Sequence, residues 1–372
     1  MLQINHIYEF FYRTIFTGKE VWYCPNGVVV PTASNIQVFT PKNRANIKIF
    51  CYDQEPFILE MAKPYMYWFT LDPGQLVLIT SEHSDLVDQY ARSQSFYSMY
   101  YFFHGFAALD WYRGYYTLNY NQPVIKEYKY DFITFNRIIH DDRSYRIYLM
   151  SKLKEQQLLD RGLISFGVAD DNKKSWRDEI INPATKLSAH ARNHSNQYLG
   201  DIDKLVIDGP ELPGSVSADI PRNLDALWHI VTETVFYYNK LHLTEKIFKP
   251  IVSKQPFMLL AAPGNLAYLR SYGFRTFDGI IDESYDNIQD NDARIDAVVK
   301  QLAWYCGLSA DEKQDVMCAL EPIVLHNFNH FYSNFKHIIT QELISNTKKL
   351  FKDLDYNDNS IDYDSIYHSL TH

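Results

Sequence analysis

Three consecutive residues, Thr244, Glu245 and Lys246, have the side chains expected at a helix start that binds an anion. A threonine can cap a helix by accepting a bond from a backbone N–H, and the remaining free amides and the helix dipole then favour negative charge. Lys246 adds a full positive charge, and Glu245 could accept hydrogen bonds from sugar hydroxyls. The segment therefore fits a diphosphate with a ribose attached, although the same three residues also make an ordinary helix start.

The elements around this segment are those of an α/β ligand site. Apolar runs predict strands at 227–232 and 256–260, and Glu233 directly follows the first of them. Ligands of open α/β sheets bind beyond the carboxyl ends of the strands, so Glu233 joins the candidate site. Pro250 lies beyond the first turn of a helix capped by Thr244, and we therefore expect that helix to be kinked or to start later.

A second group of polar side chains follows an apolar strand in the first half of the chain. The run 47–52 alternates as a strand and then breaks into Asp53, Gln54 and Glu55 before Pro56. His104 and Asp110 follow a further expected strand at 100–103 and could orient the hydroxyl of a substrate. The plainer interpretation is a strand end with two solvated carboxylates, and a structural histidine.

The remaining pattern predicts an α/β protein of two domains. Strands are also expected at 20–24, 76–79, 130–135, 163–166, 205–207 and 279–281. We expect an opening helix that stops near Gly18, a first domain over 1–126, a second over 127–329, and a C-terminal helix over 330–352 whose amphipathic core is 331–343. Residues 353–372 are polar and acidic, and we expect a partly disordered tail there.

Composition excludes several classes of protein. The chain has 372 residues with 36 Lys and Arg against 45 Asp and Glu, a formal net charge of −9, which argues against a broad basic face for nucleic acid. Its four cysteines form no CxxC pair, and no apolar run approaches the roughly 20 residues that cross a bilayer. Glu9 and Arg13 interrupt any signal-peptide core, so we expect a cytoplasmic protein. The phosphate-binding loop, the dinucleotide fingerprint and the His-Glu-x-x-His zinc motif are missing from the sequence.

Together, Glu233, the run Leu243-Thr244-Glu245-Lys246 and the following proline-containing strand resemble the nucleotide-sugar site of the α1,3-fucosyltransferase-like glycosyltransferases. In that family the segment contacts the ribose and diphosphate of the donor. The run 132–136, ending in Asn136, is similar to the family's strand before an arginine that binds the pyrophosphate. Arg143, Arg146 and Arg137 compete for this role, and we rank Arg143 first.

The resemblance also implies a fold and a reaction. The fold is the GT-B type, with two Rossmann-like domains facing a cleft, the acceptor on the first domain and the donor on the second, and a C-terminal helix packing back across them. The run 49–56 is similar to the family's strand that ends in a catalytic glutamate, which implies that Glu55 is the general base of an inverting sugar transfer. Asp53 could serve instead. The donor is expected to be a nucleoside-diphosphate sugar, with GDP implied by the resemblance.

We expect no metal cofactor. Asp201 with Asp203 and Asp290 with Asp292 match an Asp-x-Asp motif, but neither pair follows an apolar strand. The leaving diphosphate would then be stabilised by Lys246, an arginine and helix amides. A saccharide is the expected acceptor, and a hydroxymethylated base of DNA is an alternative that the net charge does not favour. The alternative from another class is a non-catalytic module that binds a nucleotide or glycan on a degenerate transferase fold.

Overall fold

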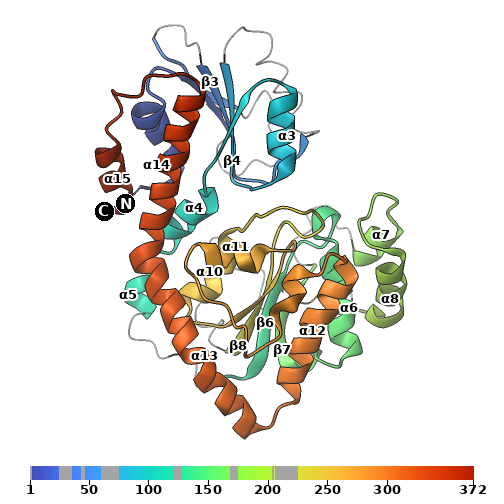
Figure 1. Cartoon of the computed structure of the whole chain (residues 1–372). Helices are drawn as coiled ribbons and strands as arrows, with labels where there is room; N and C mark the ends of the chain where they lie inside the picture. Colours follow the sequence, from blue (N-terminus) through green and yellow to red (C-terminus); the bar gives the residue numbers. More distant parts are fainter. Residues whose placement is uncertain are drawn as a thin grey trace. The chain divides into compact units, whose positions relative to one another are not determined.

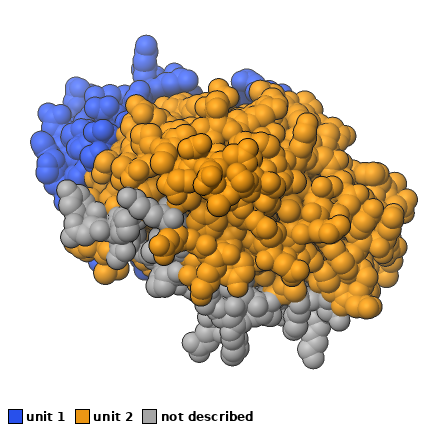
Figure 2. Space-filling view, turned by 90° about the horizontal axis from the view of Figure 1, so that it is seen from below, with its two compact units in different colours: residues 1–111, 333–372 blue, residues 112–332 orange. Residues whose placement is uncertain are grey.

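The chain divides into two compact units in the computed structural model. The structure describes residues 2–24, 36–42, 47–59, 75–119, 124, 127–167, 175–202, 205 and 225–372. Unit 1 comprises residues 1–111 and 333–372, and unit 2 comprises residues 112–332. Figure 2 colours unit 1 blue and unit 2 orange. The division after Trp111 differs from the expected boundary at 126/127, and the C-terminal helical region is shared between the units.

Unit 1 contains a five-stranded sheet in the order β2-β1-β3-β4-β5. All neighbouring pairs are parallel except β1 and β2, which are antiparallel. The strands are β1 (Glu20–Tyr23), β2 (Gln37–Phe39), β3 (Ile47–Tyr52), β4 (Gln75–Thr80) and β5 (Tyr97–Tyr100). The parallel pairing brings the carboxyl ends of β3 and β4 to one edge of the sheet, where Asp53 and the residues after Thr80 follow.

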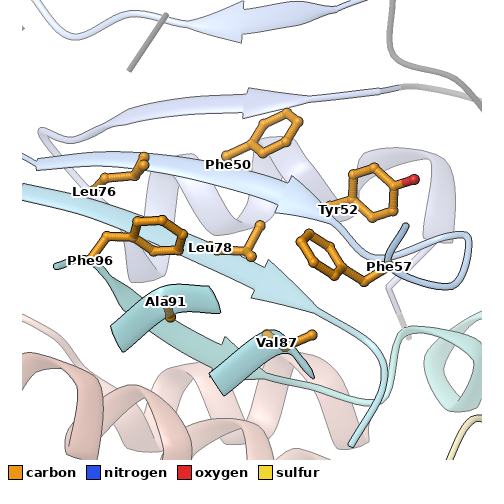
Figure 3. Close-up of a cluster of buried hydrophobic side chains, with 8 residues drawn as sticks. All are labelled: Phe50, Tyr52, Phe57, Leu76, Leu78, Val87, Ala91 and Phe96. Atoms are coloured by element: carbon orange, nitrogen blue, oxygen red, sulfur yellow. The ribbon is translucent and has the colours of Figure 1, made fainter. Parts of the chain in front are cut away.

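The core of unit 1 forms because the strand pattern and the helix pattern present apolar side chains to each other. Alternate residues of β3 and β4 point to one face, and α3 (Asp85–Ser93) covers that face with residues four apart. Figure 3 shows these side chains converging from the strands and the helix. The cluster consists of Phe50, Tyr52, Phe57, Leu76, Leu78, Val87, Ala91 and Phe96.

The other helices of unit 1 come from both ends of the chain (Figure 1). The opening helix was predicted, and it contains a 3₁₀ turn, α1 and a π-helical turn that ends at Ile15. Lys19 ties the start of β1 to the C-terminal region, since its ammonium lies 3.7 Å from the ring centroid of Tyr356. The helices are α1 (Ile7–Phe10), α4 (Phe103–Trp111), α14 (Lys336–Asp353) and α15 (Tyr363–Thr371).

Unit 2 contains a four-stranded parallel sheet in the order β7-β6-β8-β9. Its two central strands are almost wholly buried, because they are apolar runs with helices on both sides. The strands are β6 (Tyr130–Asn136), β7 (Gly162–Phe166), β8 (Ala226–Thr232) and β9 (Phe257–Leu260). The helices are α5 (Tyr115–Asn119), α6 (Tyr145–Glu155), α7 (Trp176–Ile181), α8 (Ala189–Leu199), α10 (Glu245–Val252), α11 (Asn265–Ser271), α12 (Asn291–Gly307) and α13 (Ala310–His330).

The C-terminal region is helical well beyond the predicted limits. The amphipathic core expected at 331–343 is confirmed, and Phe331, Phe335, Ile339 and Leu343 are all buried. A π-helical segment, Phe331–Phe335, connects α13 to α14. The partly disordered tail expected at 353–372 is wrong, because α15 packs against α14 and buries Ile366, Leu370 and Thr371 despite the polar composition around them.

Two expected strands are corrected, and a third lies mostly outside the described residues. The strand expected at 100–103 ends at Tyr100, and Phe103 already begins α4. The strand expected at 279–281 reduces to a single bridge between Asp278 and Ile281, since Gly279 has a φ of +87° that breaks an extended run. Of the strand expected at 205–207, Leu205 bridges to Phe166, and the other two residues lie outside the described residues.

Candidate functional site

The candidate site of unit 2 lies where β6 and β8 end and α10 begins. These two strands are parallel neighbours, so Asn136 at the end of β6 and Glu233 just after β8 lie at the same edge of the sheet. Thr244 is the N-cap of α10, and its hydroxyl accepts a bond from the Lys246 backbone N–H at 3.4 Å. The sheet edge and the helix start thus bring together residues more than a hundred positions apart.

Glu233 holds the start of α10 in place. Its side chain is fully buried, and its two oxygens accept bonds from the Thr244 backbone N–H (3.1 Å) and the Thr244 hydroxyl (2.5 Å). Burial raises the pKa of this carboxyl, while the nearby Lys246 and the bonds from Thr244 oppose the rise. Glu233 therefore positions the helix start, and in this conformation it is closed to a ligand.

Lys246 stands at the first turn of α10 with its ammonium group partly exposed. It donates to Glu245 Oε1 at 2.9 Å, to the Thr244 hydroxyl at 3.1 Å and to the Thr234 hydroxyl at 3.4 Å. Helix α10 starts at Glu245 and continues through Pro250, so the later start allowed by the sequence is wrong. The arrangement presents one cation at a helix N-terminus with three fixed oxygen partners.

The three candidate arginines occupy different environments. Arg146 is buried and donates to the backbone oxygens of Ile138 (2.9 Å) and Thr232 (2.8 Å), and burial lowers its pKa. It therefore ties the ends of β6 and β8 to α6. Arg143 is half-buried in a 3₁₀ turn, Asp141–Arg143. Arg137, directly after β6, is half-buried, and its Nε atom is buried without a hydrogen-bond partner among the described residues.

Lys249, one helical turn after Lys246, was not predicted from the sequence as a site residue. Burial lowers the pKa of Lys249 to about 8; Glu245 opposes this shift, and the charges of Lys246 and Arg137 add to it. Lys246 and Arg137 therefore both act electrostatically on Lys249, and we call these three residues the cationic cluster. The spacing of two lysines three residues apart on a helix was the signal in the sequence that could have found it.

Asn136 is fully buried at the end of β6. Its side-chain amide donates to the Thr134 hydroxyl at 3.2 Å, and its backbone N–H donates to Ser165 at 3.2 Å. Its Oδ1 atom is buried and has no hydrogen-bond partner in the described part of the chain. An unpaired buried acceptor is costly, and a donor group of a ligand or an ordered water would satisfy it.

In unit 1, the two expected carboxylates differ in accessibility. Asp53 is 2% exposed and accepts hydrogen bonds from Tyr8 (2.7 Å) and Tyr101 (2.5 Å). Burial raises its pKa to about 6, and the two tyrosine bonds oppose the rise. Glu55, two residues further along the same loop, is half-buried and more open to solvent. The Asp53 carboxylate is therefore enclosed by its two tyrosine partners, whereas the Glu55 side chain is accessible from solvent.

Glu82 was not selected from the sequence, although it follows β4 as Asp53 follows β3. It is 3% exposed and accepts bonds from the Phe57 backbone N–H (2.8 Å) and the Ser84 hydroxyl (2.6 Å). The bond to Phe57 fixes the loop that carries Glu55. The polar run after the strand 76–79 was the signal in the sequence that could have found it.

The remaining candidates have structural partners. His104 is buried inside α4, and Asp110 accepts a bond from the Ile4 backbone N–H at 3.0 Å. Asp290 caps α12 through the Ala293 N–H, and Asp292 accepts a bond from Ser188. Asp203 lies outside the described residues. Over the described ranges, no three His, Cys, Asp or Glu side chains are grouped to hold a metal ion, and no helix is long and apolar enough to span a membrane.

Comparison with models of protein families, with curated proteins and with solved structures found no match. Unit 2 is an α/β unit with a cationic cluster beside a helix N-terminus, a combination suited to a phosphorylated ligand. Unit 1 is an α/β unit with an accessible carboxylate on a braced loop at the carboxyl edge of its sheet.

Proposed function

We propose that the protein is a glycosyltransferase that moves a sugar from a nucleoside-diphosphate sugar to a hydroxyl group. In this proposal, unit 2 binds the donor, unit 1 supplies the general base, and the two units form the GT-B architecture implied by the resemblance to the fucosyltransferase-like family. The acceptor oxygen bonds to the anomeric carbon, the bond from that carbon to the phosphate oxygen breaks, and the acceptor proton passes to Glu55. The anomeric centre is inverted, and no metal ion takes part.

The cationic cluster is the observation that carries the proposal. The nucleoside diphosphate leaves with an additional negative charge, and fixed cations and helix amides stabilise charge that develops in a transition state. Lys246 and Lys249 lie on the first turns of α10, and Arg137 has an unpaired buried N–H that an oxyanion could accept from. Burial is the main cause of the lowered pKa of Lys249, and the charges of Lys246 and Arg137 add to it. A bound anion would oppose these effects by stabilising the charged form of the lysine.

This proposal reassigns two of the arginines. Arg146, like Arg137, has a buried Nε without a hydrogen-bond partner among the described residues, but its other two nitrogens donate to backbone oxygens. A ligand would have to replace these two bonds before the whole guanidinium could bind phosphate. We therefore propose Arg137 as the arginine that binds the diphosphate, and Arg143 as a residue at the margin of the site. Glu245, which is buried and paired with Lys246, is proposed to accept a bond from the ribose.

A nucleotide panel tests the proposal. Thermal unfolding of the full chain is measured with GDP, UDP, ADP, CMP and dTDP, with and without magnesium. A ligand at roughly 100 times its dissociation constant stabilises by about 2.7 kcal/mol, which is readily measured. We expect one nucleoside diphosphate to raise Tm without magnesium, and we expect Lys246→Ala to abolish that shift.

The matched control is Lys300→Ala, which removes an exposed lysine from α12 in the same unit. It should leave the nucleotide shift unchanged. The nucleotide sugar that contains the nucleotide identified in this way is then incubated with the protein. Its slow hydrolysis would indicate a transferase, and its persistence a non-catalytic module. Absence of any nucleotide shift, or a shift that survives in Lys246→Ala, would reject the donor site.

The proposed acceptor is a saccharide. Binding to DNA that contains hydroxymethylated bases would instead fall steeply with salt, because contacts to phosphate release counterions. Measuring transfer to both acceptors at 50 and 200 mM salt distinguishes them.

A further inference from the structure

A groove in unit 1 lies beside the loop that carries Glu55, and the proposed reaction does not yet assign it a role. It has a volume of about 420 Å³, which is within the 300–1,000 Å³ range of ligand pockets. Every residue that lines it belongs to unit 1 and to the described part of the chain. Its floor is β5, the last strand of the sheet, and its walls are α3 and α14.

Each wall is one face of a helix. Helix α3 contributes two pairs of residues on one face, Val87 with Ala91 and Asp88 with Arg92, and the members of each pair are four positions apart. Of these, Val87 and Ala91 also belong to the core cluster in Figure 3, so the groove has an apolar base of well-packed side chains. A groove built on a packed core keeps its shape when a ligand binds, which lowers the cost of ordering.

Helix α14 contributes the opposite wall through Asn346, Lys349, Leu350 and Asp353. These residues follow the same spacing, and Asn346 fixes the helix to the floor by donating a 2.9 Å hydrogen bond to the Tyr100 backbone oxygen. The wall therefore carries a cation, a carboxylate and an amide beside one apolar side chain.

The lining favours a neutral, polyhydroxylated ligand. Its charged side chains are three carboxylates and two cations, so the groove has no excess of positive charge to attract a phosphate. Carboxylates accept from hydroxyl groups, and amide, guanidinium and ammonium groups donate to them, so the lining can satisfy both functions of a sugar hydroxyl. Its charged members are Glu82, Asp88, Arg92, Lys349 and Asp353.

Aromatic rings in the lining also favour a saccharide ligand. His83 and Tyr100 stack with their ring centroids 3.7 Å apart, and Tyr97 lines the floor beside them. An aromatic ring offers a flat apolar surface to the C–H face of a pyranose while the polar groups around it bind the hydroxyls. The combination is that of a saccharide site and not of a site for a charged nucleotide.

Glu82 links the groove to the loop that carries Glu55, the proposed general base. Its side chain lines the groove, and the same carboxylate accepts the bond from the Phe57 N–H that braces the Glu55 loop. We propose that the groove formed by α3, β5 and α14 binds an uncharged oligosaccharide, as the acceptor site of the transferase. The assignment as an acceptor site rests on the proposed function, whereas the binding of oligosaccharide does not.

Binding is tested on the full chain by saturation-transfer NMR with maltotriose, cellotriose and chitotriose, and with an uncharged serine- and threonine-rich hexapeptide as the competing class. We expect at least one trisaccharide to bind. The double variant Asp88→Ala/Lys349→Ala should weaken that binding about tenfold or more, since each change removes a charged hydrogen-bonding group. The matched control, Asp85→Ala/Lys352→Ala, alters exposed residues of the same helices outside the groove and should not change it.

The outcomes separate the two proposals. Trisaccharide binding that is lost only in the groove variant supports the site, and it does so whether or not a nucleotide binds to unit 2. Trisaccharide binding that persists in the groove variant overturns the site, as does binding of the hexapeptide alone or of none of the probes. Thermal unfolding of both double variants verifies that they remain folded. A nucleotide shift without trisaccharide binding would leave the proposed function standing and reject the groove alone.

Discussion

Thr244 donates both its backbone N–H and its hydroxyl to the single buried carboxylate of Glu233. This pair closes the loop between β8 and α10, so the position of the helix start depends on a residue eleven positions upstream. We predict that Glu233→Gln lowers the free energy of unfolding by about 1–3 kcal/mol, because an amide cannot accept both bonds and places a donor against a donor. Urea unfolding measures the loss, and Glu127→Gln, an exposed change in the same unit, should show none.

Alanine variants of Arg146 and Arg137 should distinguish a structural arginine from one that binds a ligand. Arg146→Ala leaves the backbone oxygens of Ile138 and Thr232 without their partner, and we expect it to destabilise the chain by about 2–4 kcal/mol. Arg137→Ala should leave stability within about 0.5 kcal/mol of the parent and abolish most of the nucleotide-induced shift in Tm. If the two variants had the opposite effects, the assignment of Arg137 to the diphosphate would be wrong.

Lys249 should make nucleotide binding depend on pH. Its pKa is lowered to about 8, so it is charged below this pH and becomes neutral above it. Only the charged form attracts a phosphate, and we therefore predict that affinity falls as the pH rises from 7 to 9. Lys249→Arg keeps its charge across this range and should flatten the profile. Titration calorimetry at pH 7, 8 and 9 tests this, and a parallel fall in Lys249→Arg would contradict it.

Asp53 should make stability depend on pH in the acidic range. Its pKa rises from an ordinary value of 3.8 to about 6 on folding, so between these values the folded chain binds more protons than the unfolded chain. The stabilisation that this provides is complete below pH 3.8 and is lost as the pH rises through 6. Asp53→Asn resembles the protonated form. The unfolding free energy of the parent should therefore fall relative to that of Asp53→Asn as the pH rises from 4 to 7. Urea unfolding of both proteins measures this change.

Glu82 should affect catalysis through the loop that it braces. Glu82→Ala removes the acceptor for the Phe57 N–H, and we predict a loss of about 1–3 kcal/mol in stability together with a lower kcat. Glu55→Gln should abolish transfer without a change in stability, since Glu55 is more exposed. Donor binding by unit 2 should survive in both variants, which a nucleotide thermal shift would verify.

The sequence predicted the strands better than the contacts between them. Buried apolar runs such as 47–52 and 227–232 are recognisable locally, because strand and helix periodicity follow from backbone geometry. The partners of Arg146 or Asp53 are not, since Thr232 and Tyr101 lie 86 and 48 positions away. Helix α15 was missed for a related reason: its few apolar residues, Ile366 and Leu370, are stabilised by packing on α14 and not by composition.

The division of the chain has a consequence for its synthesis. Unit 2 is one continuous stretch, whereas unit 1 combines the first 111 residues with the last 40, and Phe16 packs edge-on against Phe351 with ring centroids 6.1 Å apart. A ribosome adds on the order of 5–20 residues per second, so the amino-terminal part waits for tens of seconds before α14 and α15 emerge. During this interval its apolar surface lacks its final cover, and unit 2 can fold first. The order of folding on the ribosome would then be the reverse of the order of the units along the chain, and chaperones would have their longest access to the amino-terminal sheet.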